Sequence, residues 1–135
     1  MSLAKVREII SNSRYGSLAT CKDGQPRVRP MAFIMLDDGR LWSSTYQCSG
    51  KMDEFRANDK AEVSFVDKQK THLRITGTID ISGDAAKKDE LLKLNPKVGK
   101  HFSGGDDPNF VHIEIRPTKI RYKTSGFNEY IIVEV

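Results

Sequence analysis

The sequence has 135 residues, of which 38% are hydrophobic and 30% are charged. A chain of this length suits one domain that buries a core without a disulfide or a metal, so we expect a single domain over residues 1–135. No apolar run approaches the roughly 20 residues of a membrane helix, and the first residues are too charged for a signal peptide, so no membrane partner is expected.

The charge is modestly positive. Lys and Arg number 22 against 18 Asp and Glu, which gives a net charge of +4. This excess suits an anionic ligand, but acidic residues interrupt nearly every basic cluster. We therefore interpret most of the charge in clusters such as residues 51–60 and 84–93 as solvated helix faces.

Two cysteines, Cys21 and Cys48, are present, and neither belongs to a CxxC pair. Free thiols in a reducing compartment are the simplest interpretation, so we expect a cytoplasmic protein. Cys48 is a candidate reactive thiol because a nearby cation and a helix start favour a thiolate, although a small loop residue without a redox role is the preferred interpretation. No His, Cys or acidic residues show metal-ligand spacing, so no metal site is expected.

The chain begins with helical spacing and then changes to the period of strands. Apolar residues at positions 3, 6, 9 and 10 predict a helix over residues 3–12. Apolar and polar residues then alternate between polar turns such as KDGQ and DDGR, which is typical of antiparallel strands. Pro26 and Pro30 indicate an edge strand or a bulge, since proline donates no ladder hydrogen bond. The expected strands cover residues 15–21, 26–36, 41–45, 61–67, 71–81, 110–123 and 128–135.

Two further helices are expected between these strands. One follows Ser49 and covers residues 52–58. Another covers residues 85–94, with Asp84 as its N-terminal cap. Residues 95–109 form the only long loop, and within it residues 101–109 are either a candidate mobile lid or a disordered segment.

Strands of this length, joined mostly by short connections, predict a mainly β fold. We expect an antiparallel β-barrel of six to seven strands with short helices packed outside it. A doubly wound parallel sheet is excluded, because it would need a helix after nearly every strand.

The segment TYQCSGK, Thr45 to Lys51, ends a strand and begins a helix. Unpaired N–H groups and the dipole at a helix start favour an anion such as phosphate. Gly50 lets an anion approach the backbone, and Ser49 and Lys51 provide a hydroxyl and a charge. Arg29 on a neighbouring strand adds a guanidinium, which suits phosphate geometry. The alternative is an ordinary serine cap beside a solvated lysine, and the glycine-rich run of a P-loop is absent.

Three motifs carry a resemblance to a known family: PRVR at residues 26–29, TYQCSGK at residues 45–51 and HLRITG at residues 72–77. In this order and spacing they resemble the pyridoxamine 5′-phosphate oxidase-like family of FMN-binding split barrels. The resemblance implies a homodimer with two FMN molecules at the subunit interface.

The resemblance also implies roles for individual residues. Arg29 would contact the FMN phosphate, and Pro30 and Met31 would run beside the isoalloxazine ring. His72 stands where the family often has a glutamine that contacts the flavin. The implied cofactor-binding residues are Arg29, Pro30, Met31, Thr45, Ser49, Gly50, Lys51 and His72.

The C-terminal sequence departs from authentic pyridoxamine phosphate oxidases. Those enzymes end with a Trp-bearing strand and an Arg-Leu-His-Asp-Arg segment that grips the substrate. Here the end is IRYKTSGFNEYIIVEV, and the only tryptophan is Trp42. We therefore do not expect oxidation of vitamin B6.

The leading hypothesis is an FMN-dependent oxidoreductase that acts on an unidentified small molecule, with NADH or NADPH as a candidate electron donor. No side chain is assigned as catalytic. The alternative is a flavin or haem carrier or sensor without turnover, for which His101 and His112 are candidate haem ligands. A deazaflavin is a further alternative cofactor.

Aromatic and basic residues near the C-terminus allow two other interpretations. Tyr122, Phe127 and Tyr130 either stack on a ring from the partner subunit or pack in the core and the dimer contact. The strand 118–123 is basic, but its lysines and arginine alternate with Tyr122 on the other face. No aromatic–basic platform is expected there, so nucleic acid is not an expected partner.

Overall fold

The computed structural model describes residues 3–47, 51–124 and 127–134. Eight antiparallel strands form one sheet, and three short α-helices and a 3-10 helix lie against it. The mainly β prediction is confirmed. In chain order the elements are α1 (Leu3–Ser11), β1 (Gly16–Lys22), β2 (Gln25–Met31), β3 (Ile34–Met35), β4 (Leu41–Tyr46), α2 (Lys51–Ala57), β5 (Lys60–Val66), β6 (His72–Asp80), α3 (Ala85–Leu94), η1 (Pro96–Lys100), β7 (Phe110–Lys123) and β8 (Ile131–Val133).

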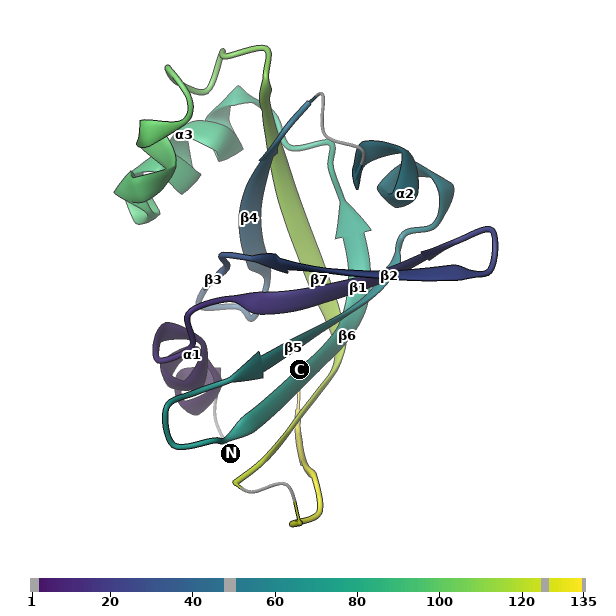
Figure 1. Ribbon diagram of the computed structural model, residues 1–135. Helices are drawn as coiled ribbons and strands as arrows, with labels where there is room; N and C mark the ends of the chain where they lie inside the picture. Colours follow the sequence, from purple (N-terminus) through teal and green to yellow (C-terminus); the bar gives the residue numbers. More distant parts are fainter. Residues whose placement is uncertain (1–2, 48–50, 125–126, 135) are drawn as a thin grey trace.

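The sheet is rolled so that strands close in sequence reach its two edges. The strand order is β2-β1-β5-β6-β7-β4-β3, and β8 pairs with β7. The two edge strands, β2 and β3, follow one another in the chain, and the β1–β2 hairpin crosses in front of β7 (Figure 1). This roll is what brings the end of β2 near β4.

Two of the predicted elements differ from those observed. The expected strand 26–36 is two strands, because the ladder of β2 ends at Met31 and β3 begins at Ile34. This division raises the strand count to eight. The expected long loop begins with η1, which follows α3 almost directly. Of the two alternatives that the prolines of β2 indicated, the edge strand is confirmed, since among the described strands β2 pairs only with β1.

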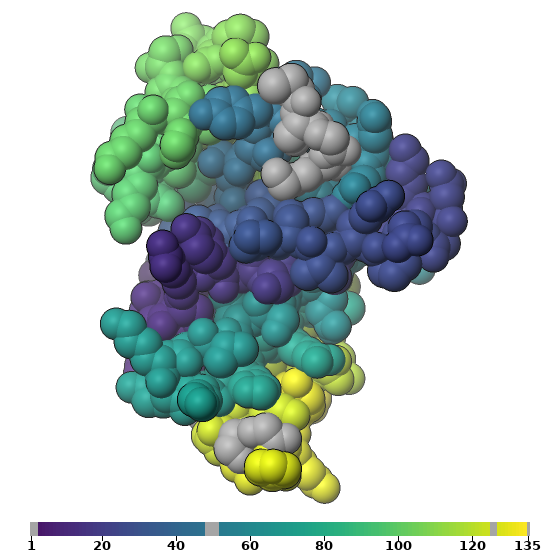
Figure 2. Space-filling view, viewed as in Figure 1, coloured from purple at the N-terminus to yellow at the C-terminus, as the bar shows by residue number. Residues whose placement is uncertain are grey.

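The apolar residues form two clusters. The larger cluster fills the inside of the rolled sheet and is closed by α1, whose Val6, Ile9 and Ile10 are buried. The smaller cluster lies on the outer face of β4 and β7, where α3 and η1 cover Trp42 and Phe110. In the space-filling view the α3–η1 segment forms one end of the molecule, and the β7–β8 hairpin forms the other (Figure 2).

Gly77 explains why the third motif ends in glycine. The pairing of β6 with β7 shifts register between Thr76 and Gly77. A Cβ atom at Gly77 would lie 2.4 Å from the backbone oxygen of Arg116, which is much closer than a real Cβ contact. This glycine is therefore required by the bulge in the ladder.

Among the residues that the structure describes, no helix is both long enough and apolar enough to cross a membrane.

Candidate functional site

A hollow of about 370 Å³ lies where the end of β2, the strand β4 and the α3–η1 segment meet. Pro30 and Met31 line it from β2, and Thr45 lines it from β4. The hydroxyl of Ser43 donates a hydrogen bond of 2.6 Å to the carbonyl oxygen of Ala32, which ties β4 to the chain just after β2. Three residues of the predicted cofactor set thus share one hollow, although they come from strands that do not pair.

Aromatic side chains form the rim of this hollow on the η1 side. Tyr46, His101 and Phe102 all line it. The Tyr46 hydroxyl lies 3.3 Å from Nδ1 of His101, and the rings of Tyr46 and Phe102 are 5.1 Å apart. Phe102 stacks at 4.3 Å on the buried Phe110, which fixes the segment after η1 to the sheet. The sequence indicated His101 as a candidate ligand but gave no sign of Tyr46 or Phe102 as its neighbours.

Arg29, the predicted phosphate ligand, does not line the hollow, and its side chain is only 13% exposed. One terminal nitrogen, Nη1, donates to Thr20 Oγ1 at 2.8 Å and to the carbonyl oxygen of Leu18 at 3.3 Å. The other, Nη2, forms an ion pair with Glu54 of α2. Burial, and to a lesser extent the charge of Arg27, lowers the pKa of Arg29 from its usual value.

The junction between β4 and α2 is only partly described. Ser49 and Gly50, and also Cys48, lie outside the described residues. Lys51 is the first residue of α2, as the sequence predicted for a helix that follows Ser49. The proposed contacts of these residues with a phosphate stay predictions.

His72 is not brought to the hollow within one chain. It pairs with Lys123, the last residue of β7, whereas Thr45 pairs with Val111 near the start of that strand. At about 3.3 Å per residue, these two positions are separated by roughly 40 Å along β7. A single protomer therefore cannot place both residues on one small molecule.

The C-terminal aromatic residues take separate positions. Tyr122 is buried in the core, and Phe127 is exposed. The ring of Tyr130 lies under three cations of β6 and β7, at 4.5 Å from Lys123, 4.8 Å from Arg121 and 5.8 Å from Arg74. Sequence reasoning did not foresee an aromatic residue on this basic face, because Tyr130 reaches it from outside the strand.

His112, the other candidate haem ligand, is fully buried beneath α3. Its ring meets the ring of Trp42 edge-on at 4.5 Å, and among the described residues neither ring nitrogen has a hydrogen-bond partner. Burial lowers the pKa of His112 from 6.5 to about 4, so the imidazole is neutral at pH 7. The side chain has no access to a ligand at the surface, and a structural role is the interpretation that agrees with this position.

Glu114 occupies the same outer face of β7 and was not singled out from the sequence. Its side chain is 1% exposed and accepts hydrogen bonds from Arg116 Nε at 2.7 Å, Arg40 Nη1 at 2.8 Å and Trp42 Nε1 at 3.1 Å. Burial opposes ionisation, but these donors and the Lys87 ammonium at 3.7 Å prevail and lower the pKa from 4.5 to about 2. The carboxylate is therefore ionised and held from several sides.

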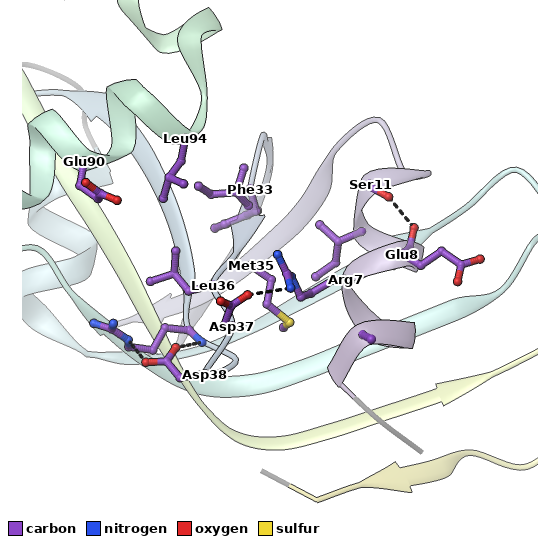
Figure 3. A pocket seen from close by; sticks show the side chains of 14 residues that line it. Arg7, Glu8, Ser11, Phe33, Met35, Leu36, Asp37, Asp38, Glu90 and Leu94 are labelled. Atoms are coloured by element: carbon purple, nitrogen blue, oxygen red, sulfur yellow. Dashed lines mark hydrogen bonds and ion pairs between the residues drawn. The ribbon is translucent and has the colours of Figure 1, made fainter.

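A larger hollow of about 860 Å³ lies between α1, β3 and α3 (Figure 3). Two ion pairs lie in it: Arg7 pairs with Asp37 at 2.8 Å, and Arg40 pairs with Asp38 at 2.7 Å. None of the predicted cofactor residues lines it. Among the described residues, no group of three or more His, Cys, Asp or Glu is placed to hold a metal ion.

Comparison with known proteins gives one family. The family model described as pyridoxamine 5′-phosphate oxidase matches residues 2–124. The chain is 28% identical to general stress protein 26 of Bacillus subtilis (strain 168) over 138 residues, which is 97% of this chain and 94% of that protein. It also resembles the crystal structure of general stress protein 26 from Bacillus anthracis str. Sterne, with a TM-score of 0.77, 25% identity, and coverage of 96% of this chain and 97% of the other.

Two more distant structures share the fold, and their names state a cofactor. A FAD-binding protein from Mesorhizobium loti has a TM-score of 0.67 and 21% identity, with 89% of this chain and 92% of the other covered. A heme binding protein from Mycobacterium smegmatis has a TM-score of 0.73 and 15% identity, with 96% of this chain and 56% of the other covered. At these identities the likeness concerns the fold alone.

Proposed function

The chain belongs to the pyridoxamine 5′-phosphate oxidase family, and on this premise we propose that it binds FMN as the cofactor of an oxidoreductase that acts on a small molecule. The observation that carries the proposal is the gathering of Pro30, Met31 and Thr45 around one hollow. These residues were assigned to the flavin from sequence motifs, and the roll of the sheet makes them neighbours.

The residues of the hollow fit the ring of a flavin. Its volume of about 370 Å³ is within the range of small-molecule sites, roughly 300–1,000 Å³. Trp42, Met31 and Phe102 offer apolar surface, and Ser44 and Thr45 offer hydroxyl groups. When bound there, FMN supplies hydride and electron chemistry, while the protein orients the ring and limits its contact with water.

The phosphate end of FMN belongs, in this proposal, beside Arg29 and the β4–α2 junction. Arg29 directly precedes Pro30 in β2, and the phosphate end of FMN is placed on the Arg29 side of that strand. Ser49, Gly50 and Lys51 complete this end with a hydroxyl, an open backbone position and a charge. A guanidinium binds phosphate through charge-assisted hydrogen bonds, which are stronger than neutral ones.

A homodimer with FMN at the subunit interface reconciles this site with the position of His72. One protomer holds the flavin through the residues of its β2 and β4, and His72 of the partner subunit approaches from the other side. The separation of His72 from Thr45 along β7 supports this division, since it rules out one chain supplying both.

The alternative is a carrier or sensor without turnover, holding a flavin or a haem. His101 supports haem as an alternative cofactor, because its exposed imidazole at the rim of the hollow is accessible to a ligand. The two classes differ in one measurement: mixing the flavin-loaded protein with NADH or NADPH under stopped flow. Rapid bleaching of the flavin band supports the oxidoreductase, and an unchanged band with both donors supports the carrier.

The cofactor assignment is tested with Arg29→Ala and Lys51→Ala. Loss of one charge-assisted contact costs about 1.5–3 kcal/mol, so FMN should bind roughly 10- to 100-fold more weakly by calorimetric titration. The matched control is Arg7→Ala, which removes an equal charge from a residue that lines the other hollow and not this one, and it should leave FMN binding unchanged. Equal FMN affinity in wild type and both site variants would refute the assignment, and a Soret band in the purified protein would replace flavin with haem.

A further inference from the structure

Arg29 is already held on both terminal nitrogens. Nη1 is occupied by Thr20 and the Leu18 carbonyl oxygen, and Nη2 is occupied by the carboxylate of Glu54. A phosphate oxygen on Nη2 would therefore have to share that nitrogen with a carboxylate, or displace it. Two anions on one guanidinium nitrogen repel each other, so the two ligands compete.

Glu54 is bound at more than one point. Its Oε2 accepts from Arg29 and, at 3.3 Å, from the hydroxyl of Thr20, while its Oε1 lies 3.9 Å from Nε of Arg27. The side chain is 19% exposed, against 13% for Arg29. Because both groups are largely withdrawn from water, solvent screens their interaction weakly.

We propose that Glu54 competes with the flavin phosphate for Arg29 and so keeps FMN exchangeable instead of permanently bound. This inference rests on the proposed function, since it takes Arg29 as the phosphate ligand. It makes Glu54 a residue that determines specificity: its charge opposes ligands that carry a phosphate at this end and does not affect the ring at Pro30 and Thr45. A flavin without the phosphate should not sense Glu54.

The test is Glu54→Gln, which keeps the size of the side chain and its hydrogen bond from Thr20 but removes the charge. By calorimetric titration, FMN should bind the variant about tenfold more tightly than wild type, or about 1.4 kcal/mol. Riboflavin, which has the same ring and no phosphate, should bind wild type and variant within twofold of each other. Asp53→Asn is the matched control: it removes the same charge from the preceding, exposed residue of α2 and should leave FMN affinity within twofold.

Each other outcome contradicts the inference in a different way. Weaker FMN binding to Glu54→Gln would mean that Glu54 positions Arg29 for the phosphate. Equal tightening by Asp53→Asn would reduce the effect to the general charge of the helix, and equal tightening for riboflavin would move it to the ring. If wild type binds riboflavin and FMN with equal affinity, or binds neither, the proposed phosphate site is refuted. The inference about Glu54, which depends on that site, is then refuted as well.

Folding of the variant is checked by circular dichroism before titration. If Glu54→Gln does not fold, Glu54→Asp tests the same competition. Asp keeps the charge but withdraws it by one methylene from Arg29, so FMN affinity should rise about threefold and riboflavin affinity should not change. An unchanged FMN affinity in a folded Glu54→Asp would overturn the inference.

Discussion

The carboxylates of Glu54 and Glu114 both pair with arginine side chains, but their surroundings differ. Glu114 is 1% exposed and accepts from Arg40, Arg116 and Trp42, with Lys87 near by. Glu54 is 19% exposed, holds Arg29 closely and reaches Arg27 only at 3.9 Å. One carboxylate is enclosed by its donors, and the other lies beside a proposed ligand site.

The difference separates a structural acid from one that can exchange partners. Removing any one donor leaves Glu114 with others, and the carboxylate itself is only 1% exposed, although Arg40 and Arg116 are 34% and 58% exposed. Glu54 has one close cation, and that cation is the proposed phosphate ligand. We therefore expect changes at Glu114 to appear in stability and changes at Glu54 to appear mainly in binding.

The largest expected effect is that of Glu114→Gln on stability. Its donors lower the pKa of the buried Glu114 carboxyl from 4.5 to about 2, so the charged form contributes about 3 kcal/mol that a neutral glutamine does not. Urea unfolding at pH 7 measures the loss. The folded pKa of Glu114, about 2, is below its usual 4.5, so this stability is present above pH 4.5 and is lost as the pH falls toward 2.

The control for this variant is Asp37→Asn. Asp37 also pairs with an arginine, at 2.8 Å, but its side chain is 93% exposed, so the change should cost less than about 1 kcal/mol. If Glu114→Gln destabilises the protein no more than Asp37→Asn does, the contrast between an enclosed and an open carboxylate has no energetic basis.

A smaller effect is expected from His112→Leu, and it depends on pH. The folded pKa of His112, about 4, is below its usual 6.5, so the unfolded chain takes up a proton first and stability falls as the pH drops from 6.5 toward 4. Wild type should lose about 2 kcal/mol between pH 7.5 and pH 5 through this residue. In His112→Leu this loss should vanish, whereas the exposed His101→Leu should retain it. Parallel losses in wild type and His112→Leu would contradict the assignment.

The smallest expected effect is that of Glu54→Gln on stability. The glutamine still accepts from Arg29 and Thr20, and Arg29 keeps the Leu18 carbonyl, so the free energy of unfolding should fall by about 1 kcal/mol. Thermal unfolding without any ligand gives this value. A loss of unfolding free energy as large as that of Glu114→Gln would show that Glu54 is also a structural acid. The proposed difference between the two carboxylates would then be refuted.

Local features of the sequence predicted most elements. The third helix occurs over Ala85–Leu94 as predicted, because Asp84 caps it by accepting from the N–H of Lys87 and Pro96 follows its end. Alternating apolar and polar residues predicted the strands β5 and β6, and burial alternates along both of them. The division after Met31 was missed, since apolar residues continue through 31–36 and give no sign that the pairing partner changes.

The contacts of the candidate site depend on packing that a sequence pattern does not contain. Glu54 lies in a charged cluster that we interpreted mostly as a solvated face, and for this residue that interpretation is wrong because the helix turns it toward Arg29. His112 and Glu114 alternate along β7 with apolar residues, yet both are buried, because Gly83 packs against His112 and Lys87 of α3 lies beside Glu114. Pro30, Met31 and Thr45 came from the family resemblance, and only the rolled sheet shows that they share a hollow.

The protein's single tryptophan, Trp42, lines the hollow and is 5% exposed. Shielding from water shifts tryptophan fluorescence to shorter wavelength, where oxidised flavins absorb, so excitation energy passes from the indole to a flavin at short range. The fluorescence of Trp42 should therefore report whether a flavin occupies the hollow, because no other tryptophan contributes to the emission. Because the rings of His112 and Trp42 meet edge-on, this fluorescence should also decrease in acid, when the imidazole becomes charged and quenches the indole.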